Sequence, residues 1–405
     1  MDNGSAQPED TRMPTRLNPF VDSLAFPAIP AVQAWAREYD GARGPLLDLS
    51  QAVPGYPPPP EMLRWLGEAA ASTGATGYGN IEGEDVLREA YAAHVAGLYG
   101  APVGAAETHV TSGCNQAFVA ASMAVAGAGD AVVMTTPCYF NHESTLSMLG
   151  IGTRFVACAP EDGFLPELDA VRAAITPEVR AFALVSPNNP TGCIYPPALL
   201  DAIFELCRAA GIWLILDETY RDFAGEADRH GLLSRPDWRE GLIQIYSFSK
   251  SLCIPGHRLG AVVAGERVVG AIAKVMDNLQ ICAPRAAQIA VARAIEPLTD
   301  WRAANRVEIG QRAVALRRTL AAAPEWRIGA MGAYFAYLRH PFAGHGSVGV
   351  ARRLAREAGV SCLPGAFFGA GQDDYLRLAF ANADSDRIAD LGSRLALLTP
   401  EGLRP

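Results

Sequence analysis

The chain has 405 residues, more than one ordinary domain, and 50% of them are hydrophobic while 19% are charged. This composition is typical of a globular protein with a large buried core, and the length favours two lobes that share an interface. The formal net charge is −9. Because no cluster of basic residues accompanies it, we expect neither nucleic acid nor an anionic membrane as a partner.

The cysteines and the first residues indicate the compartment. The eight cysteines include no C-x-x-C pair, which argues against a metal site and against a disulfide framework. The opening residues carry Asp2, Glu9 and Asp10 and have no apolar core, so they do not form a signal peptide. No segment offers the roughly 20 uninterrupted apolar residues of a membrane span. We therefore expect a cytoplasmic protein.

The N-terminal part of the chain combines short elements with loops. Residues 1–16 are polar, and we expect a disordered tail. The arm that follows contains a short helix at 29–38 and a strand at 46–50. Residues 51–60 form a loop, because their prolines can neither continue a helix nor donate to a strand ladder. Composition predicts helices at 61–72 and 84–99.

From residue 104 to 290 the chain alternates apolar runs with helical stretches. Alternation of this kind favours a mostly parallel sheet with helices on both faces, which is a three-layer α/β sandwich. After residue 268 the pattern is helical through 320, and a smaller α+β portion follows. The expected strands are 109–111, 131–135, 153–158, 181–186, 212–216, 242–246, 334–338 and 375–380. The other expected helices are 116–125, 198–210, 347–358 and 384–398.

A lysine follows one of these expected strands. Ser247-Phe248-Ser249-Lys250 comes directly after the apolar run 242–246. A lysine at the edge of an apolar sheet is costly unless its amine has a partner or a covalent role. Arg258 follows, and its planar guanidinium suits a phosphate. These residue types could hold a phosphorylated aldehyde as a Schiff base, or they could form a surface loop of serine and lysine.

Ligands of open parallel sheets sit beyond the carboxyl ends of the strands, and three further strands end in polar or aromatic residues. Gly113 follows 109–111 in a turn that opens a helix, which is either an anion cradle or a plain tight turn. Tyr139 follows 131–135 and could stack on a flat ring or pack in the core. Asn189 follows 181–186, and its amide could donate to a phenolic oxygen or a carboxylate.

The strand at 212–216 runs directly into Asp217. A carboxylate at a buried sheet edge needs a cationic or hydrogen-bonding partner, and a pyridinium nitrogen is one such partner. The alternative is a carboxylate that caps the next helix. Tyr220 lies three residues further on, where it could reach the phenolic oxygen of the same ring.

Four sequence blocks together resemble the fold-type-I pyridoxal-phosphate enzymes, and within them the class I/II aminotransferases. They are Asn-Asn-Pro-Thr-Gly at 188–192, Asp-Glu-Thr-Tyr at 217–220, Ser-Phe-Ser-Lys at 247–250 and Tyr-Leu-Arg-Leu-Ala-Phe at 375–380. The resemblance extends from about residue 46 to the C-terminus. It implies an aspartate-aminotransferase-like large domain, pyridoxal 5'-phosphate as cofactor, and a homodimer with shared active sites. The implied domains are an arm at 17–60 that contributes to the small domain, a large cofactor-binding domain at 61–290, and an interdomain helix with the small domain at 291–405.

The resemblance also implies a role for each matching residue. Lys250 would carry the cofactor and move the substrate's α-proton, and Asp217 would pair with the pyridine nitrogen. Tyr220 and Asn189 would bind the phenolic oxygen. Arg377 would bind the substrate carboxylate, rather than form a plain salt bridge at a strand end, with Asn189 and Val53 also in the substrate site. Tyr139 would stack on the ring. The implied phosphate contacts are Gly113, Cys114, Asn115, Ser247, Ser249, Arg258 and, from the second subunit, Tyr78.

The substrate follows less directly from the motifs. No residue matches an arginine that reads a dicarboxylate, because Arg285 aligns only loosely. The segments expected at the mouth of the site carry Phe26, Ile29, Val53 and Tyr56, which favours a neutral or aromatic side chain. We therefore predict transfer of an amino group between such an L-α-amino acid and a 2-oxo acid by a ping-pong mechanism. His142 either supports the ring's aspartate or packs in the core.

Other functions remain open on the sequence. Lyases, cyclases and oxidases of the same fold use the same lysine and aspartate, so the reaction outcome is undecided. A regulator that senses the cofactor would carry an added DNA-binding domain, for which the short acidic N-terminus has no room. A plain metabolite-binding protein would have no use for Lys250. The identity of the amino donor and of the acceptor is not readable from the residues.

Overall fold

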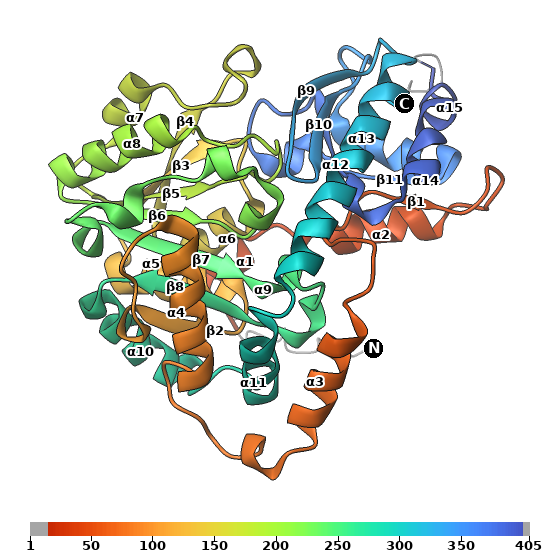
Figure 1. Ribbon diagram of the computed structural model, residues 1–405. Helices are drawn as coiled ribbons and strands as arrows, with labels where there is room; N and C mark the ends of the chain where they lie inside the picture. The colour runs from red at the N-terminus through yellow and green to blue at the C-terminus, as the bar shows by residue number, and fades with distance from the viewer. Residues whose placement is uncertain (1–14, 400–405) are drawn as a thin grey trace, which may run out of the picture.

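Seven strands form the central sheet of the larger of two lobes in the computed structural model, which describes residues 15–399 (Figure 1). Every neighbouring pair in this sheet is parallel except the two pairs that involve β8. The mostly parallel sheet that the sequence predicted is therefore confirmed. In spatial order the strands are β2 (Thr108–Thr111), β8 (Gly260–Ala264), β7 (Leu242–Ser247), β6 (Trp213–Asp217), β5 (Val179–Val185), β3 (Ala131–Thr136) and β4 (Gly152–Ala157).

Helices cover both faces of this sheet, because successive side chains of each strand point to opposite sides. In β6, Leu214 and Leu216 belong to the apolar cluster on one face, whereas Ile215 belongs to the cluster on the other. The predicted three-layer arrangement is confirmed. One layer holds α3 (Pro60–Ala70), α4 (Asp85–Tyr99), α8 (Pro197–Ala210) and α11 (Arg285–Ala294), and the other holds α5 (Cys114–Val125), α6 (Phe140–Met148) and α10 (Glu266–Leu279).

Several elements differ from the sequence prediction. The sequence did not predict β8, whose residues are glycine, alanine and valine, or the helices α6 and α7 (Leu168–Ala174). The helical pattern expected from 268 to 320 is present as three helices, α10, α11 and α12 (Thr299–Ala321). They are separated near Pro284 and Pro297, because proline cannot continue a helix. The predicted tail at 1–16 lies almost entirely outside the described residues.

The smaller lobe has an antiparallel sheet and a separate pair of short strands. Its four-stranded sheet places β13 between β12 and β10, with β9 at the edge. The arm strand β1 pairs in parallel with β11, so the beginning and the end of the described chain meet in this lobe (Figure 1). The strands are β1 (Leu47–Asp48), β9 (Arg327–Gly332), β10 (Phe335–Arg339), β11 (Val360–Ser361), β12 (Leu363–Pro364) and β13 (Tyr375–Ala379).

The remaining helices complete the two lobes. The long helix α12 runs between them in Figure 1. Within residues 15–399, no helix combines the length and the apolar character that crossing a membrane requires. The predicted domain boundaries at 60 and 290 remain our proposal for how the chain is divided. The other helices are α1 (Pro19–Asp22), α2 (Ala28–Arg37), α9 (Phe248–Ser251), α13 (Ser347–Arg353), α14 (Ser385–Ala389) and α15 (Leu391–Leu395).

The two lobes come into backbone contact at a pair of glycines. Gly192 follows β5 in the larger lobe with φ +74°, and Gly332 ends β9 in the smaller lobe. A Cβ atom added to either residue would overlap the backbone of the other. Because Gly192 closes the Asn-Asn-Pro-Thr-Gly turn, this contact fixes the turn against the smaller lobe.

We predict that Gly332→Ala destabilises the protein by about 1–3 kcal/mol, because backbone atoms cannot move away as the end of a flexible side chain can. Thermal unfolding would show this as a fall in Tm of a few degrees. Gly310→Ala in α12 is the matched control, since a Cβ there meets no atom within 4 Å and alanine favours a helix. Equal Tm values for the two variants would contradict the contact.

Candidate active site

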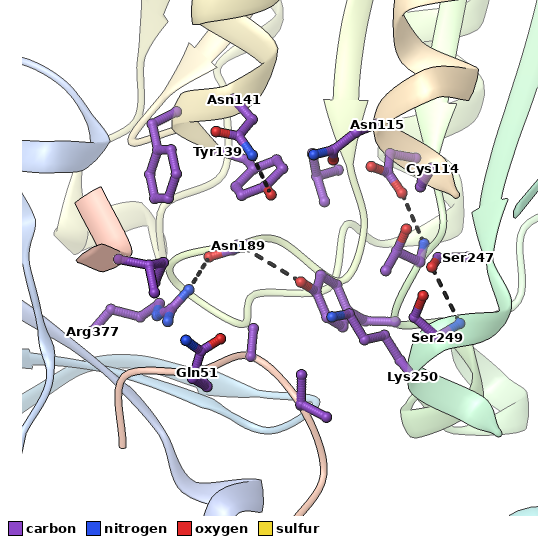
Figure 2. Close-up of a pocket in the computed structure, with 18 of the residues that line it drawn as sticks. Gln51, Cys114, Asn115, Tyr139, Asn141, Asn189, Ser247, Ser249, Lys250 and Arg377 are labelled. Carbon is purple, nitrogen blue, oxygen red and sulfur yellow. Dashed lines mark hydrogen bonds between the residues drawn. The ribbon is translucent and has the colours of Figure 1, made fainter. Parts of the chain in front are cut away.

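A cavity of about 220 Å³ lies where the carboxyl ends of β5, β6 and β7 face the smaller lobe. Figure 2 shows Lys250 entering it from the larger lobe and Arg377 from the smaller one. The structure thus brings together residues that are far apart in the sequence. Of the predicted site residues, those that line the cavity are Val53, Cys114, Asn115, Tyr139, Asn189, Asp217, Tyr220, Ser247, Ser249, Lys250, Arg258 and Arg377.

Lys250 lies in the short helix α9, directly after β7, and points into the cavity. Burial of its amine, followed by repulsion from the guanidinium groups of Arg258 and Arg377, lowers the pKa of Lys250 to about 8. A lysine with this pKa carries an appreciable fraction of free amine near neutral pH. The side chain is therefore suited to act as a nucleophile toward an aldehyde and as a proton carrier.

The end of the cavity nearest α5 has the features of an anion site. Gly113 precedes the helix with φ +85°, and the amides of Cys114 and Asn115 lie in the first turn, where helical N–H groups have no intrahelical acceptor. The guanidinium of Arg258 lies so close to Gly113 that an added Cβ would be 2.5 Å from its Nη2. Only glycine therefore allows this approach, and Gly113 shapes the site without lining the cavity.

Two serines complete the same end of the cavity. The Oγ of Ser247 accepts a hydrogen bond from the N–H of Ser249 at 3.3 Å. The Oγ of Ser249 is buried and has no hydrogen-bond partner among the described residues. A buried hydroxyl without a partner is costly, so this atom indicates a missing ligand oxygen.

Asp217 is 5% exposed at the end of β6. Its Oδ1 accepts the N–H of Thr219 at 2.9 Å, and its Oδ2 lies 3.4 Å from Nε2 of His142. The His142 ring stacks on Phe118 with centroids 3.8 Å apart. The histidine ring therefore packs in the core and lies beside the carboxylate, although its Nε2 forms no hydrogen bond within the described residues. Its support of Asp217 stays a prediction.

Arg377 is 1% exposed and lines the cavity from the smaller lobe. Its Nη1 donates to Oδ1 of Asn189 at 3.1 Å, and its Nη2 donates to the carbonyl of Ser50. The amide of Asn189 in turn donates to the hydroxyl of Tyr220 at 3.4 Å. Burial lowers the pKa of Arg377 to about 10, so the group remains a cation at neutral pH. Its Nε has no partner among the described residues.

Sequence reasoning missed several residues of the cavity. Asn141 donates its amide to the hydroxyl of Tyr139 at 2.9 Å and thereby fixes the orientation of that ring. Tyr139 both lines the cavity and packs against the apolar core of the smaller lobe. The position of Asn141 two residues after Tyr139 was the only available signal. Phe140 and Thr219 also line the cavity without having been predicted, whereas Gln51 and Ala52 belong to the loop that was expected at its mouth.

Some of the residues considered from sequence do not line the cavity. Tyr78 is 81% exposed on this chain, and its contribution to a second subunit stays a prediction. Phe26 is exposed, and Tyr56 packs against Trp301 with ring centroids 5.9 Å apart. Arg285 forms an ion pair with Glu84 at 2.6 Å, so its charge is matched within the chain. Ile29 does line the cavity, as expected.

The cavity residues fit pyridoxal 5'-phosphate. The first turn of α5, Arg258 and the free hydroxyl of Ser249 suit its phosphate. The amine of Lys250, with its lowered pKa, suits its aldehyde. The buried carboxylate of Asp217 suits a protonated ring nitrogen. These donors, the amine and the carboxylate therefore line one cavity.

Comparisons of the sequence and of the structure with known proteins also indicate an aminotransferase. The chain matches the family Aminotransferase class I and II over residues 45–395. It is 28% identical over 356 residues to an aromatic aminotransferase of Arabidopsis thaliana, covering 86% of this chain and 88% of that protein. It is 29% identical over 374 residues to an aspartate/prephenate aminotransferase of Thermus thermophilus, covering 90% and 94%. A solved aspartate aminotransferase of Thermus thermophilus with maleate superposes with a TM-score of 0.86 at 28% identity, covering 95% of this chain and 99% of that chain.

We predict that Lys250 titrates near pH 8 in the protein without cofactor, because burial and the two guanidinium groups disfavour its charged form. Below that pH the amine is protonated and unreactive, so its labelling by an amine-directed reagent should rise through pH 8. Lys274, on the surface of α10, is the only other lysine of the chain and serves as the internal reference. Mass spectrometry of the two peptides would measure both rates. A Lys250 curve that coincided with that of Lys274 would contradict the prediction.

Proposed function

The chain belongs to the class I and II aminotransferases, which depend on pyridoxal phosphate, and we propose that it transfers the amino group of a neutral or aromatic L-α-amino acid to a 2-oxo acid by a ping-pong mechanism. The observation that carries the proposal is the small number of cations in the cavity, each of which has an expected ligand group. Its cationic lining residues are Lys250, Arg258 and Arg377. Lys250 would bind the cofactor's aldehyde, Arg258 its phosphate and Arg377 the substrate's α-carboxylate, so no cation of the cavity is left to bind an acidic side chain.

The larger lobe would hold the cofactor. Arg258, Ser247, Ser249, Gly113, Cys114 and Asn115 would surround its phosphate, with Tyr78 of a second subunit in a shared homodimeric site. Asp217 would hold a proton on the ring nitrogen, Tyr139 would stack on the ring, and Tyr220 with Asn189 would bind its phenolic oxygen. When bound, the cofactor supplies a protonated ring that accepts the electron pair left when the α-proton is removed.

The protein residues perform the remaining tasks. Arg377 would bind the substrate's α-carboxylate with its guanidinium, oriented by Asn189. That contact places the α-carbon toward Lys250, whose amine is suited to remove the proton and to return it at a different atom. Cavity closure between the lobes would exclude water from the proton transfer. The same groups serve both halves of the reaction, as a ping-pong mechanism requires.

The side-chain preference rests on the other lining residues. Ile29, Val53 and Phe140 are apolar, and Gln51 and Asn141 are neutral amides. An acidic side chain placed among them would be desolvated without a counter-ion, which is costly. A neutral aliphatic or aromatic side chain would instead bury apolar surface there. We therefore expect kcat/KM for such donors to exceed that for aspartate.

We predict that the purified yellow holoenzyme loses its visible absorbance when a neutral or aromatic L-amino acid is added and regains it on addition of a 2-oxo acid. Lys250→Ala should lack the absorbance band of the lysine Schiff base, because no other residue of the cavity can form a Schiff base with the cofactor's aldehyde. Lys274→Ala is the matched control and should keep both the band and the reaction. Stopped-flow absorbance spectra recorded with single amino donors, including aspartate, would also measure the side-chain preference.

The same experiment separates the alternatives. Loss of absorbance with release of ammonia or peroxide, and without recovery on addition of a 2-oxo acid, would indicate a lyase, a cyclase or an oxidase. Such a result would contradict amino transfer. Persistence of the Schiff-base absorbance band in Lys250→Ala would contradict the assignment of the lysine.

We predict that Arg377→Gln lowers kcat/KM for every amino donor by roughly 100-fold, because a charged hydrogen-bonded contact is lost. The cofactor absorbance of the variant should remain, since Arg377 lies at the substrate end of the cavity. Arg339→Gln is the control, because this arginine pairs with Asp374 on the surface of the same lobe. Steady-state kinetics would be measured for both. A donor-specific loss would assign Arg377 to side-chain recognition instead.

A further inference from the structure

A second cavity, of about 70 Å³, shares a wall with the candidate active site. Val185 lines the active-site cavity while the next residue, Ser186, lines the second one. In the same way Asp217 and Tyr220 line the first cavity, whereas Glu218 and Arg221 line the second. The segments that follow β5 and β6 therefore separate the two cavities. Helix α4 adds His94, Leu98 and Tyr99 to the lining, and α12 adds Arg306.

The carboxylates of the second cavity already have donors. Both oxygens of Glu218 accept the hydroxyl of Tyr99, at 2.6 and 2.7 Å, and one of them also accepts the amide of Gln244. His230 Nε2 lies 3.2 Å from the same carboxylate. Although burial alone would raise the pKa of Glu218, His230 and Arg221 outweigh that effect and lower it. This carboxylate is charged and saturated.

The two aspartates of the cavity are also engaged. Asp222 Oδ2 accepts the hydroxyl of Tyr246 at 2.7 Å, and its Oδ1 lies 3.8 Å from Arg302. Asp228 Oδ2 accepts the N–H of Gly225 at 2.8 Å. Each carboxylate that lines the cavity therefore already accepts a hydrogen bond within the described residues, so none of them requires a bound cation.

Two of the three arginines that line the cavity, in contrast, have unused donors, whereas Arg229 pairs with Glu226. Arg221 is 9% exposed and lies over the Tyr246 ring at 4.1 Å, with its Nη2 donating to Tyr91 at 3.1 Å. Its Nη1 lies 3.8 Å from Oε2 of Glu218, but neither Nε nor Nη1 has a hydrogen-bond partner in the described part of the chain. Arg306 of α12 is half-buried at the cavity and pairs with no carboxylate within residues 15–399. Because the buried donors of Arg221 are costly without acceptors and Arg306 adds a second cation, the cavity is suited to an anion.

The rest of the lining restricts the kind of anion. Leu98, Pro187, Ile194 and Leu200 give the cavity an apolar portion. A free inorganic anion would leave these side chains without a partner, whereas an organic anion would bury them. A planar carboxylate also matches the planar guanidinium group in shape.

We propose that the second cavity is a binding site for a small organic carboxylate with an apolar body, separate from the substrate site. The carboxylate would bind at Arg221 and Arg306, and the apolar body would lie on Leu98, Ile194 and Leu200. Amino transfer itself has no use for this site. Its ligand would contact the segments that also carry Asp217 and Tyr220, from the side opposite the cofactor.

The test is to count binding sites on the holoenzyme by calorimetry with 4-methylvalerate, which has no amino or oxo group and cannot react. We expect two molecules per chain, one that depends on Arg377 and one that depends on Arg306. Arg306→Gln should weaken binding at the Arg306-dependent site by about tenfold or more and leave binding at the Arg377-dependent site unchanged. Arg317→Gln, an exposed arginine of the same helix, is the matched control.

Two results would overturn the proposal. One is a wild-type holoenzyme that binds a single molecule per chain, lost in Arg377→Gln. The other is equal binding by Arg306→Gln and Arg317→Gln. Inorganic phosphate titrated under the same conditions tests the role of the apolar portion. Weaker binding of phosphate than of 4-methylvalerate at the Arg306-dependent site supports an organic ligand, and equal or tighter binding contradicts it.

Discussion

The buried guanidinium of Arg377 connects the parts of the protein that form the active site. It contacts the carbonyl of Ser50 from the arm and the amide of Asn189 from the larger lobe, while its own strand β13 lies in the smaller lobe. A buried cation is tolerated only where dipoles and aromatic faces replace water, and Phe335 and Phe368 lie 5.1 and 5.5 Å from it. The relative placement of arm and lobes is therefore coupled to the site that would receive a carboxylate.

The charges of the cavity follow from the same constraint. Two arginines and a lysine line one cavity with a single aspartate, so the cations repel one another and the most easily deprotonated of them loses its proton first. Lysine is that group, because arginine retains its proton even when burial lowers its pKa. The reactive amine thus arises first from burial of Lys250 and then from the surplus of positive charge around it. A phosphate and a substrate carboxylate would restore the balance.

The segments after β5 and β6 serve two cavities with different chemistry. The residues that face the active site are suited to a cofactor ring, whereas those on the other side build a network in which Glu218 is saturated and Arg221 is not. The strand β6 ends at Asp217, and the chain then turns into a 3-10 helix at Arg221–Phe223, so side chains of this short segment point into different cavities. A ligand in the second cavity would therefore act on the same backbone that positions Asp217.

The sequence by itself determined the chemical groups of the site and the order in which the strands present them. Apolar runs that end in Asp217, Asn189 and Lys250 were readable because strand period and polarity are local properties. The strand β8 was not, because a short run of glycine, alanine and valine carries little local signal. Only the tertiary structure decided which groups meet. Asn189 and Arg377 are 188 residues apart, and the lowered pKa of Lys250, the pairing of Arg285 with Glu84 and the second cavity all depend on burial and distance. Those quantities exist only once the chain has folded.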